Sequence, residues 1–232
     1  QGTVKFLCPC PGYDRHFGVT EFFGIEMIIV PMTEHGPDMD MVEQLVNTDA
    51  SIKGIWCVPK YSNPQGITYS DETVRRFAAL KPAAKDFKIF WDNAYCVHNI
   101  TDTPDQLLNL MDECKKQGNE DLPIIFASTS KITFPGAGVA AMAGSKNTLA
   151  NIRKRLSFQT IGPDKVNQLR HLRFLEDMNG VETIMNQHKE LLQPKFNIVL
   201  ETMQKQLAPV GVASWTTPHG GYFISVDVME GC

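Results

Sequence analysis

The feature that most constrains the fold is an alternation, over about the first 145 residues, of short apolar runs with polar or helix-forming stretches. Short apolar runs predict buried strands, and helix-length spacers between them predict repeated β-α units. The expected strands cover residues 4–7, 26–30, 52–58, 88–91, 124–127 and 139–143. This part of the chain is therefore predicted to form an α/β fold on a mostly parallel sheet.

Two helices are expected between these strands. The first covers residues 38–47 and follows a Gly-Pro pair. The second covers residues 70–80 and opens on Ser70, followed by two acidic residues that complement the helix dipole. Pro82 is expected to end it, because proline cannot continue the hydrogen-bonded ladder.

After about residue 146 the pattern changes to long helical stretches. The expected helices cover residues 146–158, 164–178 and 181–207. Asn179 and Gly180 are expected to end the second of these, and Pro194 to kink or divide the third. A final segment, residues 212–226, is expected to form two strands around a glycine turn.

These changes of pattern predict three parts. Residues 1–158 are expected to form part of a large domain, residues 159–193 linking helices, and residues 194–232 an incomplete smaller domain. The chain opens with Gln1 close to an expected strand and stops abruptly at Cys232. We therefore expect it to be a fragment of a longer protein.

Composition narrows the class of partner. The chain has 232 residues, 43% of them hydrophobic, and a formal net charge of -4 with a pI near 5.9. No basic block favours nucleic acid or a membrane surface, and no apolar run is long enough to span a bilayer. The six cysteines, at positions 8, 10, 57, 96, 114 and 232, lack metal-ligand spacing. These features predict a soluble cytoplasmic protein with reduced thiols and a small-molecule partner.

The segment with the clearest chemistry is residues 127–138, in which Lys131 stands between small hydroxyl residues and a glycine-rich turn. An apolar run over residues 122–127 leads into it, and the ends of strands are where α/β folds keep their chemistry. A lysine held partly out of water loses its proton more easily and can form a Schiff base with an aldehyde. Lys131 is therefore a candidate nucleophile.

Three further candidate positions follow expected strands. Tyr13 comes after the first strand and can stack on a flat ring. Asn63 precedes Pro64 in a turn that leaves its amide free for a ligand. Asp92 ends a hydrophobic strand, and Tyr95 places a phenol three residues on.

Each position also has a structural interpretation. Residues 63–66 can be a plain turn, Asp92 can cap a following helix, and the two tyrosines can be core aromatics. The Gly-Gly segment near residue 220 can be a hairpin. Three histidines share no ligand pattern and are not expected to bind metal: His16, His98 and His219.

Together, the motifs resemble the fold type I aminotransferases that use pyridoxal 5'-phosphate. The motifs that carry the resemblance are residues 63–66, 92–95, 128–131 with the following Pro-Gly, and 218–223. The opening at residues 11–17 further resembles a bacterial aspartate aminotransferase subgroup. The resemblance implies a three-layer fold with helices on both faces of the sheet, a large cofactor-binding domain and a homodimer.

The resemblance also implies a role for each candidate. Lys131 would form the internal aldimine and later move a proton between substrate and cofactor. Asp92 would pair with the pyridine nitrogen, and Asn63 and Tyr95 would hydrogen-bond the ring phenolate oxygen. Tyr13 would stack on the ring. The phosphate would accept hydrogen bonds from the hydroxyls of Ser128 and Ser130.

The sequence departs from the family pattern near Gly138, where an arginine that grips the phosphate is expected. The family's other phosphate-binding loop would lie before residue 1, and its carboxylate-binding arginine beyond residue 232. The implied reaction moves an amino group between an amino acid, with aspartate as a candidate, and a 2-oxo acid. The alternatives are a lyase of the same fold, a cofactor-binding regulatory domain of a transcription factor, and an α/β domain without this chemistry.

Overall fold

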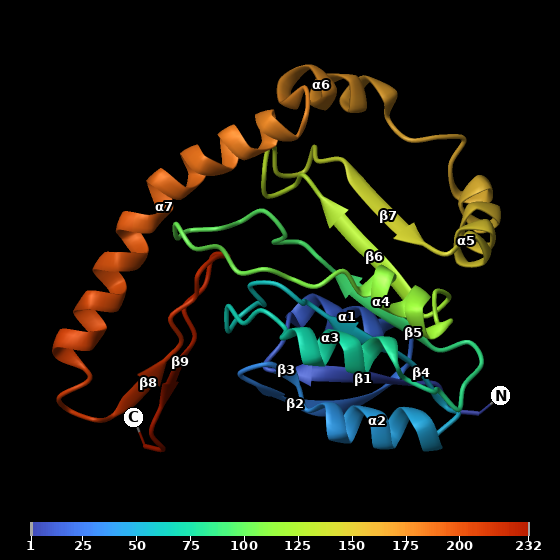
Figure 1. Ribbon diagram of the computed structural model, residues 1–232, viewed down its shortest axis with the longest axis horizontal. Helices are drawn as coiled ribbons and strands as arrows, with labels where there is room; N and C mark the ends of the chain where they lie inside the picture. The colour runs from blue at the N-terminus through green and yellow to red at the C-terminus, as the bar shows by residue number, and fades with distance from the viewer. Residues whose placement is uncertain (1, 232) are drawn as a thin grey trace.

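The main body of the chain is a seven-stranded sheet of order β3-β2-β1-β4-β5-β6-β7 (Figure 1). The computed structural model describes residues 2–231. The strands are β1 (Lys5–Cys10), β2 (Glu26–Thr33), β3 (Gly36–Pro37), β4 (Ile52–Cys57), β5 (Lys88–Asp92), β6 (Pro123–Ser128) and β7 (Ala140–Gly144). Neighbours from β2 to β6 pair in parallel, and the edge strands β3 and β7 are antiparallel. The expected mostly parallel sheet is confirmed.

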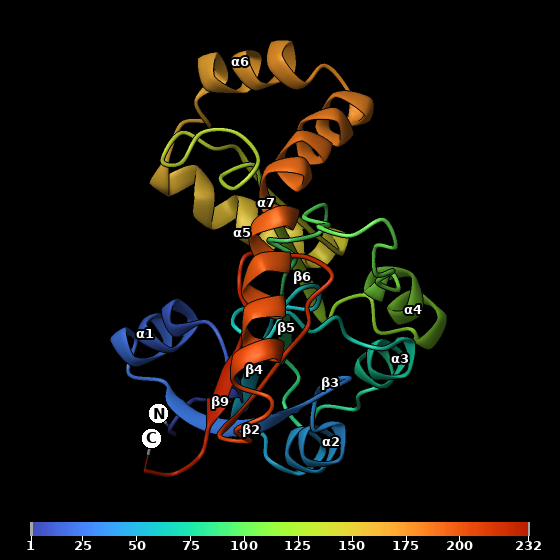
Figure 2. The ribbon, with the colours of Figure 1, turned by 90° about the vertical axis from the view of Figure 1, so that its left-hand side faces the viewer.

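Helices cover both faces of this sheet, as expected (Figure 2). Helix α1 (Asp14–Phe22) lies on one face, and α2 (Met39–Thr48), α3 (Asp71–Ala78) and α4 (Leu110–Gln117) lie on the other. Ser70 caps α3 as predicted, because its side chain accepts a hydrogen bond from the Thr73 amide. Helix α4 was not expected. Helix α1, which begins at Asp14 directly after Tyr13, was not expected either.

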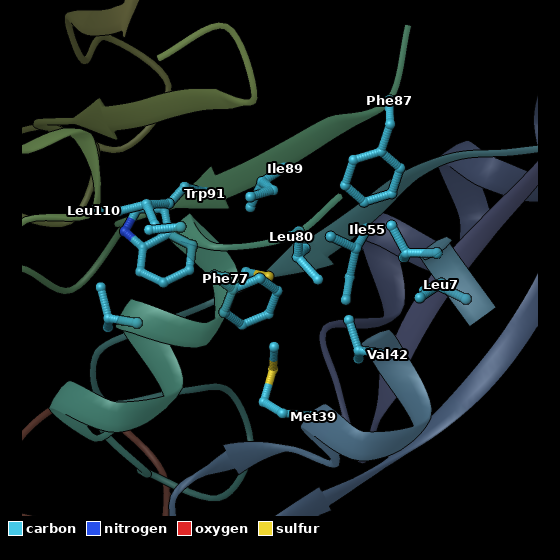
Figure 3. Packing of buried hydrophobic residues seen from close by; sticks show 14 of the residues in the cluster. Leu7, Met39, Val42, Ile55, Phe77, Leu80, Phe87, Ile89, Trp91 and Leu110 are labelled. Atoms are coloured by element: carbon cyan, nitrogen blue, oxygen red, sulfur yellow. The ribbon is translucent and has the colours of Figure 1, made fainter. Parts of the chain in front are cut away.

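The hydrophobic core lies between the sheet and helices α2, α3 and α4 (Figure 3). The Trp91 ring packs against Tyr69 and Phe77, with ring centroids 5.6 Å and 5.7 Å away. Successive strand residues point to opposite faces, so Phe90 lies on the α1 face, where its ring centroid is 4.7 Å from that of Trp56. Asp92, two residues further along β5, therefore also belongs to the α1 face.

Three helices follow the sheet and form an arc beside it (Figure 1). They are α5 (Lys146–Gln159), α6 (Lys165–Leu175) and α7 (Met178–Gln206). Each begins with a side chain that caps a main-chain amide: Ser145, Asp164 and Asp177. We call α5, α6 and α7 the helical arc.

The structure contradicts the expected helix end at Gly180 and the expected division of the last helix at Pro194. Gly180 does not end a helix but lies in the first turn of α7, where a Cβ atom would come 1.7 Å from the Leu175 carbonyl oxygen. The glycine is thus required for the close approach of α6 and α7. Pro194 removes one amide donor, yet α7 continues through it without division. The expected domain boundary at residues 193/194 falls inside α7, and the division into domains stays a prediction.

A two-stranded antiparallel sheet completes the fold, with strands β8 (Ala213–Trp215) and β9 (Val226–Val228). Two strands were expected here, but the glycine turn between them is wrong. Gly220 lies in the long connection between the strands and forms an isolated bridge with Asn99. This connection therefore docks on the main body instead of making a hairpin turn.

Five described cysteines are free thiols: Cys8, Cys10, Cys57, Cys96 and Cys114. Cys232 and Gln1, which also entered the sequence-based expectations, lie outside the described residues. Within residues 2–231 no helix combines the length and apolar character needed to cross a bilayer.

Candidate active site

Four segments meet at the carboxyl edge of the parallel strands. Tyr13 directly precedes α1, just after β1, and Asn63 lies in the connection after β4. Asp92 ends β5, with Tyr95 in the turn beyond it, and Lys131 lies in the turn after β6. Because parallel strands present their carboxyl ends at one edge, the topology brings these segments together. Tyr13 and Asn63 line one cavity there.

Lys131 lies over the ring of Tyr95. Its Nζ is 4.8 Å from the ring centroid, a cation-π distance. The Tyr95 side chain is buried, and burial raises the pKa of its phenol to about 12, an effect opposed by the polar Asn63 side chain beside it. Tyr13 packs against the same cluster. Four of the predicted residues are therefore neighbours.

The Asp92 carboxylate has a partner that the sequence reasoning missed. His16 Nε2 lies 3.0 Å from Asp92 Oδ2, and its ring stacks on Trp56 with centroids 4.5 Å apart and an interplanar angle of 11°. An ionised carboxylate only accepts, so we assign Nε2 as the donor. The alternative use of Asp92 as a helix cap is wrong, because the next helix, α4, begins only at Leu110.

His16 was missed because helix α1 was not predicted. Tyr13 and His16 are three residues apart, a spacing that brings side chains to one side of a helical turn. The Thr20 hydroxyl donates to the His16 carbonyl and accepts from Trp56 Nε1 at 2.8 Å. A sequence signal was available in Asp14, an acidic residue in the first turn.

Ser128 and Ser130 form a pair of hydroxyls at the end of β6, with their Oγ atoms 2.7 Å apart. Gly138 packs closely against Ser130. A Cβ atom at position 138 would come 2.9 Å from the Ser130 amide nitrogen. An arginine therefore does not fit here without moving the main chain, and Gly138 shapes the turn.

The Lys131 turn is also fastened to the helical arc. Thr133 Oγ1 lies 2.7 Å from His171 Nε2, and Asn167 Nδ2 donates to the Ala137 carbonyl at 2.9 Å. His171 and Asn167 both belong to α6. Among residues 2–231, no three His, Cys, Asp or Glu side chains gather in a way that could hold a metal ion.

Comparisons with known proteins find similarity over the whole chain. The family model described as aspartate amino-transferase matches residues 1–232. A Mycolicibacterium smegmatis relative named as an aminotransferase is 54% identical, over 100% of this chain and 54% of its own length. The solved structure of a Corynebacterium glutamicum aspartate transaminase superposes with a TM-score of 0.96 at 48% identity, covering 100% of this chain and 54% of that one.

A more distant structure shares the fold. Pyrococcus horikoshii kynurenine aminotransferase, solved in complex with PMP, has a TM-score of 0.84 at 21% identity, over 100% of this chain and 56% of that one. The chain spans about half the length of the curated relatives it matches. The match over all its residues shows that this chain belongs to the aspartate aminotransferase family.

Proposed function

We propose that the whole protein is a pyridoxal 5'-phosphate-dependent aminotransferase that moves an amino group between an amino acid and a 2-oxo acid. The observation that carries the proposal is the placement of Lys131 Nζ over the Tyr95 ring, beside the strand end that bears Asp92. An amine and a carboxylate on neighbouring strand ends supply the two charged contacts that the cofactor's aldehyde and ring nitrogen need. Aspartate is the amino acid we propose first.

The described residues fit this cofactor. Asp92 offers an acceptor to a protonated ring nitrogen, and the Tyr95 phenol and Asn63 amide offer donors to the ring oxygen. Ser128 and Ser130 offer hydroxyls to a phosphate. When bound, the cofactor supplies an electron sink for the carbanion formed at the substrate α-carbon.

The chain's own residues would then act as follows. Lys131 Nζ would bind the cofactor at its aldehyde carbon and would, as a free amine, move the α-proton of the substrate. His16, held by its stacking on Trp56, would keep the Asp92 carboxylate aimed at the ring nitrogen. Tyr13 would cover one face of the ring. A homodimer and a cytoplasmic location stay predictions of the sequence.

The direct test is borohydride reduction of the full-length protein with pyridoxal 5'-phosphate, followed by peptide mapping. We expect the label on the Lys131 peptide, and its loss in Lys131→Ala. Lys85, an exposed lysine, provides the matched control, since Lys85→Ala should leave the labelling unchanged. A label on other lysines with none on Lys131 would remove the proposed mechanism.

Product analysis separates the reactions. With aspartate and 2-oxoglutarate we expect glutamate to form. Labelling of Lys131 without glutamate would exclude aspartate transamination and direct the search to other amino acids. Release of ammonia or carbon dioxide would favour a lyase, and cofactor binding without turnover of any amino acid would favour a regulatory domain.

A further inference from the structure

Aromatic rings from two distant parts of the chain contact Lys131. Tyr95 and His98 follow β5, whereas Tyr222 lies between β8 and β9. The three ring centroids are mutual neighbours: 5.6 Å from Tyr95 to His98, 5.5 Å from His98 to Tyr222, and 6.1 Å from Tyr95 to Tyr222. Lys131 thus meets a residue supplied by the C-terminal segment.

The main chain of Lys131 is held by two of these rings. The Tyr222 hydroxyl donates to the Lys131 carbonyl at 3.1 Å, and His98 Nε2 lies 3.4 Å from the same oxygen. A carbonyl only accepts, so His98 carries its proton on Nε2. His98 Nδ1 is buried without a hydrogen-bond partner among the described residues, which agrees with a neutral ring.

Residues 218–222 reach this position through main-chain contacts with the turn after β5. The Ile100 amide donates to the His219 carbonyl at 2.9 Å, and the Gly221 amide donates to the His98 carbonyl at 2.8 Å. The same turn therefore carries His98 and anchors the segment that carries Tyr222.

Two glycines allow residues 218–222 to pack closely against Tyr61. At Gly220 a Cβ atom would come 2.2 Å from the Tyr61 ring, and at Gly221, which has φ of 78°, it would come 3.2 Å from the same side chain. Tyr61 is fully buried and its hydroxyl donates to Asn99 Oδ1 at 2.7 Å. The segment therefore rests on a fixed surface, and Tyr222 is delivered to one position.

We propose that Tyr222 is a positioning residue for Lys131. Two donors on one carbonyl restrict the peptide plane at Lys131, and that plane sets the direction in which the side chain leaves the turn. The docking of residues 218–222 thereby controls the placement of the amine over Tyr95. This inference rests on the proposed function for its catalytic consequence, but its structural part does not.

The test uses Tyr222→Phe in the full-length protein, which keeps the ring and removes only the hydroxyl. Hydrogen exchange of the amides in residues 129–138 should become about three- to tenfold faster, the range expected for loss of one hydrogen bond. In the cofactor-loaded protein kcat should fall by a similar factor while KM for the amino acid stays within about twofold.

Thr48→Val is the matched control, because the exposed Thr48 hydroxyl at the end of α2 donates only within its own helix, to the Gln44 carbonyl. It should leave both the exchange of residues 129–138 and kcat unchanged. Unchanged exchange and kcat in Tyr222→Phe would overturn the proposal, as would equal effects of the two variants. Faster exchange in a protein without transaminase activity would support the positioning of Lys131 and overturn only the proposed function.

Discussion

The sheet and the helical arc bury their apolar side chains in different ways. In the sheet, Leu7, Ile55 and Ile89 are fully buried against α2, α3 and α4. In the arc, Phe158 is 84% exposed and Leu191 67% exposed. Within residues 2–231, only the sheet encloses a core of its own.

The difference explains how the candidate site is built. Strand ends on a packed sheet hold Asp92 and Ser128 in defined positions. The turn that carries Lys131 is held instead by polar contacts to α6, such as that between Thr133 and His171, and by the hydroxyl of Tyr222. The packed sheet thus holds the strand ends, whereas hydrogen bonds hold the turn that carries Lys131.

The largest expected effect separates the two regions directly. Trp91→Ala in the full-length protein should lower the free energy of unfolding by about 3–5 kcal/mol, because it removes a large ring from the core. Leu191→Ala in α7 should change it by less than about 0.5 kcal/mol. Denaturant unfolding checks both, and equal losses would contradict the comparison.

A pH effect is expected where the turn after β5 meets the C-terminal segment. Burial lowers the pKa of His98 from 6.5 to about 4, and the groups facing it are Tyr95, Tyr222, Lys131 and His188. The unfolded chain binds the proton more readily, so stability is full above pH 6.5 and falls as pH drops towards 4. The loss should reach up to about 3 kcal/mol.

His98→Gln should flatten this part of the stability curve, measured by denaturant unfolding at a series of pH values. His35→Gln is the control, since His35 is exposed. The same flattening in both variants, or none in His98→Gln, would show that burial of His98 does not cause the loss of stability at low pH.

A smaller effect is expected where the sheet meets the Lys131 turn. Gly138→Ala places a Cβ atom 2.9 Å from the Ser130 amide and should cost about 1–3 kcal/mol in stability. Affinity for pyridoxal 5'-phosphate should fall with it, as measured by absorbance titration. Gly162→Ala, where no atom lies within 4 Å of the added carbon, should leave affinity unchanged. Equal affinities in the two variants would argue against a tight turn at Ser130.

The smallest effect tests a single fastening of the turn to the arc. Thr133→Val removes the contact of its hydroxyl with His171, together with one to the Thr129 carbonyl, and should cost about 1 kcal/mol. Hydrogen exchange in residues 129–138 should accelerate accordingly. Thr183→Val in α7 loses a hydroxyl that bonds only its own helix, and it should not change exchange in that turn. Faster exchange of residues 129–138 in Thr183→Val would mean that the turn responds to any change in the arc and not specifically to the His171 contact.

Local chemistry made much of the fold predictable. The strand at Ile52–Cys57 and the helix start at Ser70 follow from apolar runs and capping residues, which act within a few positions. Gly180 shows the limit of such reasoning. It has the appearance of a helix end, but it is glycine because the Leu175 carbonyl approaches it.

The sequence by itself determined which strand ends carry an amine, a carboxylate, an amide and a phenol, because residue type and strand periodicity are local properties. Only the tertiary structure decided their partners. His16 meets Asp92 across 76 positions, and Tyr222 meets Lys131 across 91. Such contacts depend on strand order, register and the docking of a distant segment, and no local pattern encodes these.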